Sequence, residues 1–223
     1  MKSKDSLEEM RRLLQARLQE WRLQEQQPQY RPKRVVTITR ESGCGGESVA
    51  ERICAELGFH LYNWELVEQI AQDAEVSTRL VSALDEHRRS ELEDWLAEIE
   101  GDSSLSTEAY LGSLKRVLFA IAVHGNAVIV GRGSNFYLPP DMKIGLCLVA
   151  PLDVRIKNTM KALGLSEKEA RKQISKQEEE HWRLVKNYFH ADMRDSTHYH
   201  LVVNTAIVNP ETIVQIVKIL VQA

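Results

Sequence analysis

The sequence predicts an α/β protein with a parallel sheet, and three features support that prediction. Short β-branched or apolar runs alternate with longer segments of helical periodicity. The run at 35–39 leads through a glycine-rich turn into a helix that Gly58 is expected to end. The run at 127–131 is apolar on both faces, as a strand inside a parallel sheet should be.

The other elements follow from the same signals along the chain. Residues 5–26 have the periodicity of an amphipathic helix, and Ser6 with Glu9 forms a capping-box pattern near its start. Ser166 with Glu169 forms a second such pattern before a long charged helix. Further strands are expected at 59–62, 144–150 and 200–205, and further helices at 63–72, 76–87 and 106–124, after Pro151 and after Asn209-Pro210.

The glycine-rich turn S-G-C-G-G, at 42–46, points to phosphate binding. A strand, such a turn and a helix aim several backbone N–H groups and the positive end of a helix dipole at one point. The P-loop pattern G-x-x-x-x-G-K-[ST], anchored on Gly45, meets Arg40 at its first glycine, Gly46 at its lysine and Glu47 at its hydroxyl residue. The same residues are also consistent with a turn that only packs a helix against a strand.

Composition narrows the class of protein. The 223 residues suit one α/β domain, alone or with an appendage. A net charge of −3 argues against a dedicated nucleic-acid binder. There is no apolar run of about 18 residues, so we expect no membrane partner. Three cysteines without metal-site spacing, together with a polar N-terminus, favour a cytoplasmic protein.

Four blocks of sequence resemble a known family. I-T-R-E-S-G-C-G-G-E-S-V-A and L-G-F-H-L-Y-N-W-E-L-V are similar to the opening of the cytidylate kinase-like family. V-I-V-G-R-G-S-N and M-R-D-S-T-H-Y-H-L-V-V-N-T are similar to two later blocks of that family, in the same order. In the family, arginine replaces the first glycine of the P-loop pattern and glycine replaces its lysine, so these two departures are family features.

The resemblance implies a fold and a division of the chain. The fold would be the three-layer P-loop kinase fold, a five-stranded parallel sheet flanked by helices. Residues 34–223 would form the kinase-like domain, with an acceptor-binding insertion at about 63–124 and a lid at about 180–196. Residues 1–33, an amphipathic helix and a linker, lie outside the resemblance. That helix would either contact a second copy or a partner protein, or pack back on its own domain.

The resemblance also implies roles for individual residues, with ATP and Mg²⁺ as the cofactors. Arg132 would hold the acceptor phosphate, whereas the plainer alternative is a surface arginine between glycines. Arg183 and Arg194 would close over the transferring group, and Arg40 would supply charge in place of the loop lysine. Arg155 would contact the donor or transferred phosphate, or would be a charge on a helix face. The donor phosphates would lie against the backbone of the loop, whose Ser48 would also reach the metal: Gly43, Cys44, Gly45, Gly46, Glu47 and Ser48.

The sequence departs from the family pattern in two places. Asn63-Trp64 stands where the family has Asp-Arg, and the lid carries Asn187 and His190 where relatives have basic residues. The main hypothesis is phosphoryl transfer from ATP to a nucleoside monophosphate, with CMP as the default acceptor. The alternatives are a weak or inactive nucleotide-sensing module that uses the N-terminal helix, and a kinase for another small metabolite.

Two further sets of residues have weaker signals. Three histidines and an aspartate near the C-terminus could bind a metal, but their spacing is more typical of ordinary surface or core residues: His190, Asp192, His198 and His200. Asn204 and Thr205 lie near the strand-to-helix join where the family has its adenine pocket, which makes them candidates for contact with the base.

Overall fold

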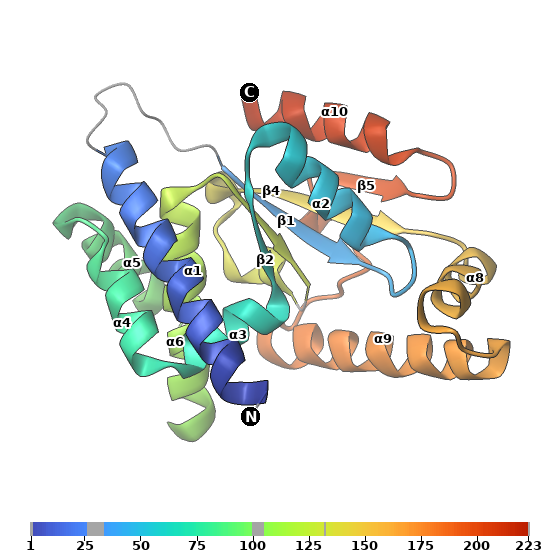
Figure 1. Ribbon diagram of the computed structural model, residues 1–223, viewed down its shortest axis with the longest axis horizontal. Coiled ribbons are helices and arrows are strands. Elements are labelled where there is room, and N and C mark those ends of the chain that lie inside the picture. The colour runs from blue at the N-terminus through green and yellow to red at the C-terminus, as the bar shows by residue number, and fades with distance from the viewer. Residues whose placement is uncertain (1, 26–33, 100–104, 132, 223) are drawn as a thin grey trace. The chain divides into compact units, whose positions relative to one another are not determined.

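The computed structural model describes residues 2–25, 34–99, 105–131 and 133–222. The chain forms two compact units (Figure 1). A sheet unit takes residues 33–62 and 126–223, and a helical unit takes residues 1–32 and 63–125.

Five parallel strands form the sheet, in the order β2-β3-β1-β4-β5. β1 is central and long, and Ile38 in it lies opposite both Val130 of β3 and Leu146 of β4. The five-stranded parallel sheet predicted from the sequence is therefore confirmed. The strands are β1 (Val35–Arg40), β2 (His60–Asn63), β3 (Ala127–Val130), β4 (Lys143–Val149) and β5 (Leu201–Asn204).

Helices lie on both faces of the sheet, which gives the predicted three layers. On one face α2 (Gly46–Leu57) and α10 (Pro210–Gln222) pack together and against the strands (Figure 1). The opposite side carries the short helix α7 (Ser134–Tyr137), which packs on β1, and α9 (Glu167–Phe189), where Phe189 meets Tyr137 edge to face. α8 (Leu152–Leu163) joins β4 to α9, and two short 3-10 helices, η1 (Pro140–Met142) and η2 (Ser196–His198), precede β4 and β5.

The alternation of side chains along β1 decides which residues can reach the functional site. Val36 and Ile38 are fully buried in the core with α2 and α10. Thr37 points to the other face, where its hydroxyl donates to Asn135 Oδ1 at 3.1 Å. By the same alternation Arg40, the last residue of β1, points toward the side of the sheet that α2 covers.

The predicted helix ends in this unit agree with the structure. Ser166 and Glu169 make both halves of a capping box at the start of α9. Gly58 takes the left-handed conformation, with φ of 68°, at the end of α2. The Asn209 side chain accepts from Thr212 N at 2.8 Å in the first turn of α10.

The helical unit has five helices among its described residues: α1 (Lys2–Glu25), α3 (Trp64–Gln72), α4 (Ala74–Ser82), α5 (Glu86–Ile99) and α6 (Leu105–His124). The predicted end of α6 is confirmed, because Gly125 and Asn126 both have positive φ there. The predicted capping box of Ser6 and Glu9 is wrong, because α1 already begins at Lys2 and Ser6 therefore lies inside the helix.

The N-terminal helix packs on its own unit. Its residues Met10, Leu14 and Trp21 are each at most 4% exposed, and α1 contacts α3 and α4. Trp21 stacks on His124 of α6 with 3.8 Å between ring centroids. Burial lowers the pKa of His124 to about 4, although Asp85 acts to raise it. The apolar stripe of α1 is thus covered within the chain. This agrees with the prediction that the helix packs back on its own domain.

Asn63 and Trp64, where the chain departs from the family pattern, both serve the start of α3. The Asn63 side chain caps the helix by accepting from Leu66 N at 2.9 Å. Trp64 is 5% exposed and belongs to the core of the helical unit. Among the helices that the structure describes, none is both long and apolar enough to span a bilayer.

Candidate active site

The glycine loop joins β1 to α2 and is pressed onto α8. Gly43 and Gly45 have φ of 84° and 83°, a conformation that favours glycine. A Cβ on Gly43 would lie 2.5 Å from the carbonyl oxygen of Arg155 and 2.7 Å from Thr159 Oγ1. No other residue fits at position 43, because the backbone of α8 occupies that space.

Hydrogen bonds hold the carbonyl side of the loop against the sheet unit. Asn158 Nδ2 donates to the carbonyl of Gly43 at 2.9 Å, and Thr205 Oγ1 donates to that of Cys44 at 2.7 Å. Cys44 is itself buried, which raises the pKa of its thiol to about 11. α2 then starts at an N-cap glycine, Gly45, whose lack of a side chain leaves the first turn without a side-chain cap. The start of such a helix suits an anion such as phosphate.

Arg40 lies directly over the start of α2. Its Nε and Nη2 are 2.8 and 2.6 Å from Glu47 Oε1. Burial alone would raise the pKa of Glu47, but the charge of Arg40 and its hydrogen bond outweigh burial, so the pKa lies below its usual value. The site therefore holds a cation from β1 beside a carboxylate in the first turn of α2.

A cavity of about 280 Å³ lies beside the loop, within the sheet unit. Its floor comes from the ends of β1, β4 and β5, and its other walls come from α9 and the segment that follows α9. The lining residues are Thr39, Arg40, Glu41, Cys147, Val149, Glu178, His181, Trp182, Met193, Arg194, Tyr199 and Val202. A small adjoining hollow shares Arg40 and His181 with the cavity and adds Gly131 and Gly133 at the end of β3. In an open α/β sheet, this carboxyl edge of the strands is where ligands bind.

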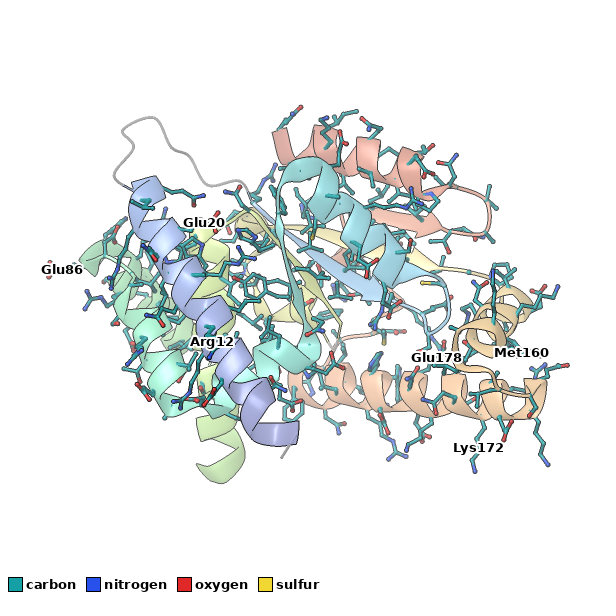
Figure 2. The ribbon with its side chains drawn as sticks, viewed as in Figure 1. Arg12, Glu20, Glu86, Met160, Lys172 and Glu178 are labelled. Atoms are coloured by element: carbon teal, nitrogen blue, oxygen red, sulfur yellow. The ribbon has the colours of Figure 1, made fainter. Side chains whose placement is uncertain are left out.

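Arg155 joins several segments of the sheet unit. Its side chain is 8% exposed, and its Nε donates to the carbonyl of Ala150 at 2.9 Å and lies 3.4 Å from Glu41 Oε2. Its Nη1 binds the Glu178 carboxylate and lies 3.4 Å from the carbonyl of Ser42. In Figure 2, Glu178 stands on the side of α9 that faces the sheet and Lys172 on the opposite side. Arg155 thus links the loop, the β4–α8 junction and α9.

The two arginines predicted to belong to a lid differ in their surroundings. Arg194 lines the cavity, whereas Arg183 is 67% exposed and pairs with Glu179 at 2.6 Å along α9. His181 and Trp182, which sequence reasoning missed, line the cavity instead. A signal for them existed, because Ile174, Glu178, His181, Trp182 and Val185 share one face of α9, and Ile174 and Val185 are buried.

Other predicted residues are placed as follows. Ser48 is exposed in the first turn of α2, beside Glu47. Arg132 lies outside the described residues. The side chains of Asn204 and Thr205, at the end of β5, both make hydrogen bonds within the sheet unit. Asn204 Oδ1 accepts from Ala206 N at 3.0 Å. The Thr205 hydroxyl lies 3.2 Å from the carbonyl oxygen of Val149, besides its hydrogen bond to the carbonyl of Cys44.

Two of the C-terminal histidines, His198 and His200, make contacts within the sheet unit. Among the described residues, no group of three or more metal-binding side chains comes together. The His198 ring contacts the Phe136 ring edge to face, with 5.2 Å between ring centroids. His200 Nδ1 accepts from Gly145 N at 3.0 Å. The plainer prediction, ordinary structural histidines, therefore agrees with the structure.

The sheet order, the glycine loop between β1 and α2, and the cavity under α9 together define a P-loop-type kinase. Comparison with known sequences shows the family. The profile of the cytidylate kinase-like family matches residues 35–207, more than half of the chain. The chain belongs to the cytidylate kinase-like family.

Individual relatives agree with this assignment. A cytidylate kinase from Ignicoccus hospitalis is 27% identical over 185 residues, which is 82% of this chain and 96% of the relative. A cytidylate kinase from Pyrococcus horikoshii is 27% identical over 188 residues, 83% of this chain and 87% of the relative. The solved structure of an uncharacterized protein from Eubacterium ventriosum has a TM-score of 0.66 at 20% identity and covers 85% of this chain and 98% of its own, which supports the fold.

The predicted family and the predicted enzyme class are confirmed. The protein is a kinase that transfers a phosphoryl group to a nucleotide or another small metabolite. α1 ends before residue 35 and therefore lies outside the matched range.

Proposed function

We propose that the protein transfers the γ-phosphoryl group of ATP to a nucleoside monophosphate, with CMP as the default acceptor. The observation that carries this proposal is the placement of the glycine loop, with its uncapped helix start, beside a cavity that two arginines line. Such a site can bind the phosphates of two substrates next to each other. The choice of CMP rests on the relatives, which are named cytidylate kinases.

The donor phosphates would bind at the loop. Backbone N–H groups between Gly43 and Ser48 and the positive end of the α2 dipole would face them. Mg²⁺ prefers oxygen ligands and binds to substrate phosphates, to water and to few protein groups. The exposed hydroxyl of Ser48, with the Glu47 carboxylate beside it, is the kind of donor that fits this ion.

Transfer would take place in the cavity. A bond forms between an acceptor phosphate oxygen and the γ-phosphorus, while the bond from that phosphorus to the β–γ bridging oxygen breaks and ADP leaves. Such chemistry depends mainly on positioning and on neutralising charge. Arg132 would hold the acceptor phosphate, and Arg40, Arg183 and Arg194 would supply positive charge around the transferring group.

Arg155 has a different part in this proposal. Its guanidinium is already paired with the carboxylates of Glu41 and Glu178, so it would contact a phosphate only by exchanging one of these partners. Its present role is to hold the loop and α9 at a fixed separation, which keeps the cavity open for substrates.

A second candidate is transfer to a different small acceptor. It is favoured by one observation, the structural use of Asn63 as a helix cap and of Trp64 as a core residue where the family has Asp-Arg. Neither side chain reproduces the charges of the family pair, so the acceptor need not be CMP.

An acceptor panel tests the proposal. ADP release would be measured with ATP, Mg²⁺ and each nucleoside monophosphate in turn. We expect turnover that depends on the acceptor, and a fall of at least about 100-fold in kcat/KM in Arg132→Ala, because a bidentate phosphate contact is lost. Arg171→Ala is the control, since Arg171 is 54% exposed on α9 and its ion pair with Glu167 lies along the same helix. Unchanged kcat/KM in Arg132→Ala would contradict the role given to Arg132.

A further inference from the structure

The loop has no lysine at position 46, and the structure shows what occupies the space of a side chain there. A Cβ built on Gly46 would lie 2.8 Å from Cδ of Arg40 and 3.1 Å from its Cβ. The aliphatic part of Arg40 therefore crosses the Cα of Gly46. Any side chain at position 46, including the lysine of the P-loop pattern, would displace Arg40.

The position of Arg40 follows from the strand before it. The alternation along β1 turns Val36 and Ile38 toward α2, and Arg40 is next in that series. Because β1 ends where the loop begins, the side chain of its last residue comes to lie on the first residue of α2. The guanidinium then extends to the edge of the cavity, which Arg40 also lines.

Glu47 is the partner of the Arg40 guanidinium at the start of α2, the helix end to which the donor phosphates are proposed to bind. Its carboxylate lies in the first turn of α2 and takes two hydrogen-bonding contacts from the guanidinium of Arg40. A phosphate bound at this loop would likewise be an anion at a helix start that pairs with a guanidinium. The Glu47 side chain is 64% exposed and so is free to leave when a stronger anion arrives.

We propose that Arg40 and Gly46 are a reciprocal replacement for the loop lysine. Arg40 supplies from the end of β1 the cation that a lysine would supply from α2, and Gly46 is a positioning residue that makes room for it. Glu47 is a second positioning residue, which holds the guanidinium at the loop until a donor phosphate takes its place. This inference rests on the proposed function, because it requires that nucleotide phosphates bind at this loop.

A purely structural role for Gly46 makes the opposite prediction. Gly46 is the first residue of α2 and does not have a positive φ, so alanine fits its backbone. Alanine in place of such a glycine normally leaves stability unchanged or increases it. A loss of ATP affinity in Gly46→Ala, without a loss of thermal stability, would therefore report on Arg40 and not on folding.

A double-mutant cycle tests the coupling. ATP affinity would be measured by calorimetry with Mg²⁺ for the wild type, Gly46→Ala, Arg40→Ala and the double variant. We expect each single variant to bind ATP about tenfold or more weakly, as the loss of a charge-assisted bond predicts. The double variant should bind no more weakly than Arg40→Ala alone. Wild-type affinity in Gly46→Ala, or two losses that multiply in the double variant, would overturn the proposal.

A rescue adds a second test. The substitutions Arg40→Gly and Gly46→Lys together introduce the P-loop pattern G-x-x-x-x-G-K at positions 40–46. We expect this pair to bind ATP about tenfold more tightly than Arg40→Gly alone. Equal affinity of the two variants would contradict the reciprocal replacement.

The ion pair can be followed without nucleotide. A crystal structure of the wild type should show the ion pair of Arg40 with Glu47, and one of Gly46→Ala should show the Arg40 side chain displaced from it. An unchanged Arg40 side chain in Gly46→Ala would overturn the inference alone. A normal ion pair in a wild type that binds no ATP would instead overturn the proposed function and, with it, the role of the pair.

Discussion

Arg40 and Arg155 show how the surroundings of a residue decide its use. Both lie within reach of the glycine loop, and the family resemblance makes both candidates for contact with phosphate. Arg155 has an 8% exposed side chain between two carboxylates and two carbonyl groups, whereas Arg40 is 23% exposed and holds one exposed carboxylate. A guanidinium with many buried partners serves the fold first, and one with a single exposed partner can exchange it for a ligand.

The first consequence concerns stability. Arg155→Met should lower the free energy of unfolding by about 2 kcal/mol, because Glu41 and Glu178 lose their cation while each keeps partial access to water. Urea denaturation would measure this change. Lys157→Met, at an exposed position of the same helix, is the control and should change stability by less than about 0.5 kcal/mol. If Arg155→Met kept full stability, Arg155 would not be what holds the loop, the β4–α8 junction and α9 together.

At the scale of elements, strands and helices supply different parts of the cavity. β1, β4 and β5 supply the floor of the cavity, and α9 supplies Glu178, His181 and Trp182. α1 has a different role, because its apolar stripe packs on the helical unit. A dimer or partner contact by α1 remains a prediction, and it would have to use the exposed part of the helix, where Leu13 is 39% and Leu23 57% exposed.

Two adjacent leucines measure how firmly α1 is packed. Leu14 is 2% exposed and Leu13 is 39% exposed. Leu14→Ala should lower the free energy of unfolding by about 2–4 kcal/mol, because it removes buried methyl groups and leaves a cavity. Leu13→Ala should cost less than about 1 kcal/mol. Chemical denaturation of the two variants side by side checks this. Equal losses would mean that the stripe of α1 is not oriented as described.

At the scale of the whole molecule, the sequence predicts the sheet well and the site in part. Apolar runs such as 127–131 allow little besides a buried strand, and all five predicted strands are present. The partners of a side chain are harder to predict, because they come from distant segments. Nothing local to Arg155 indicates that Glu41 and Glu178 will enclose it, and the periodicity of α1 shows that one face is covered without showing by what.

The exchange of glycine and arginine in the loop illustrates the same limit. Sequence comparison shows Arg40 at a glycine position and Gly46 at a lysine position as two separate departures. Only the fold shows that one side chain fills the space left by the other. The two departures are six residues apart in the chain and become one feature where β1 meets α2.

Whether the protein transfers a phosphoryl group to a nucleoside monophosphate can be measured by ³¹P NMR. The wild-type protein would be mixed with ATP, Mg²⁺ and equal amounts of CMP, UMP, AMP and GMP. We expect the γ-phosphate signal of ATP to decline while ADP and a second nucleoside diphosphate appear together, with CDP first. Intact ATP beside unchanged monophosphates, or hydrolysis to free phosphate with no new diphosphate, would contradict it.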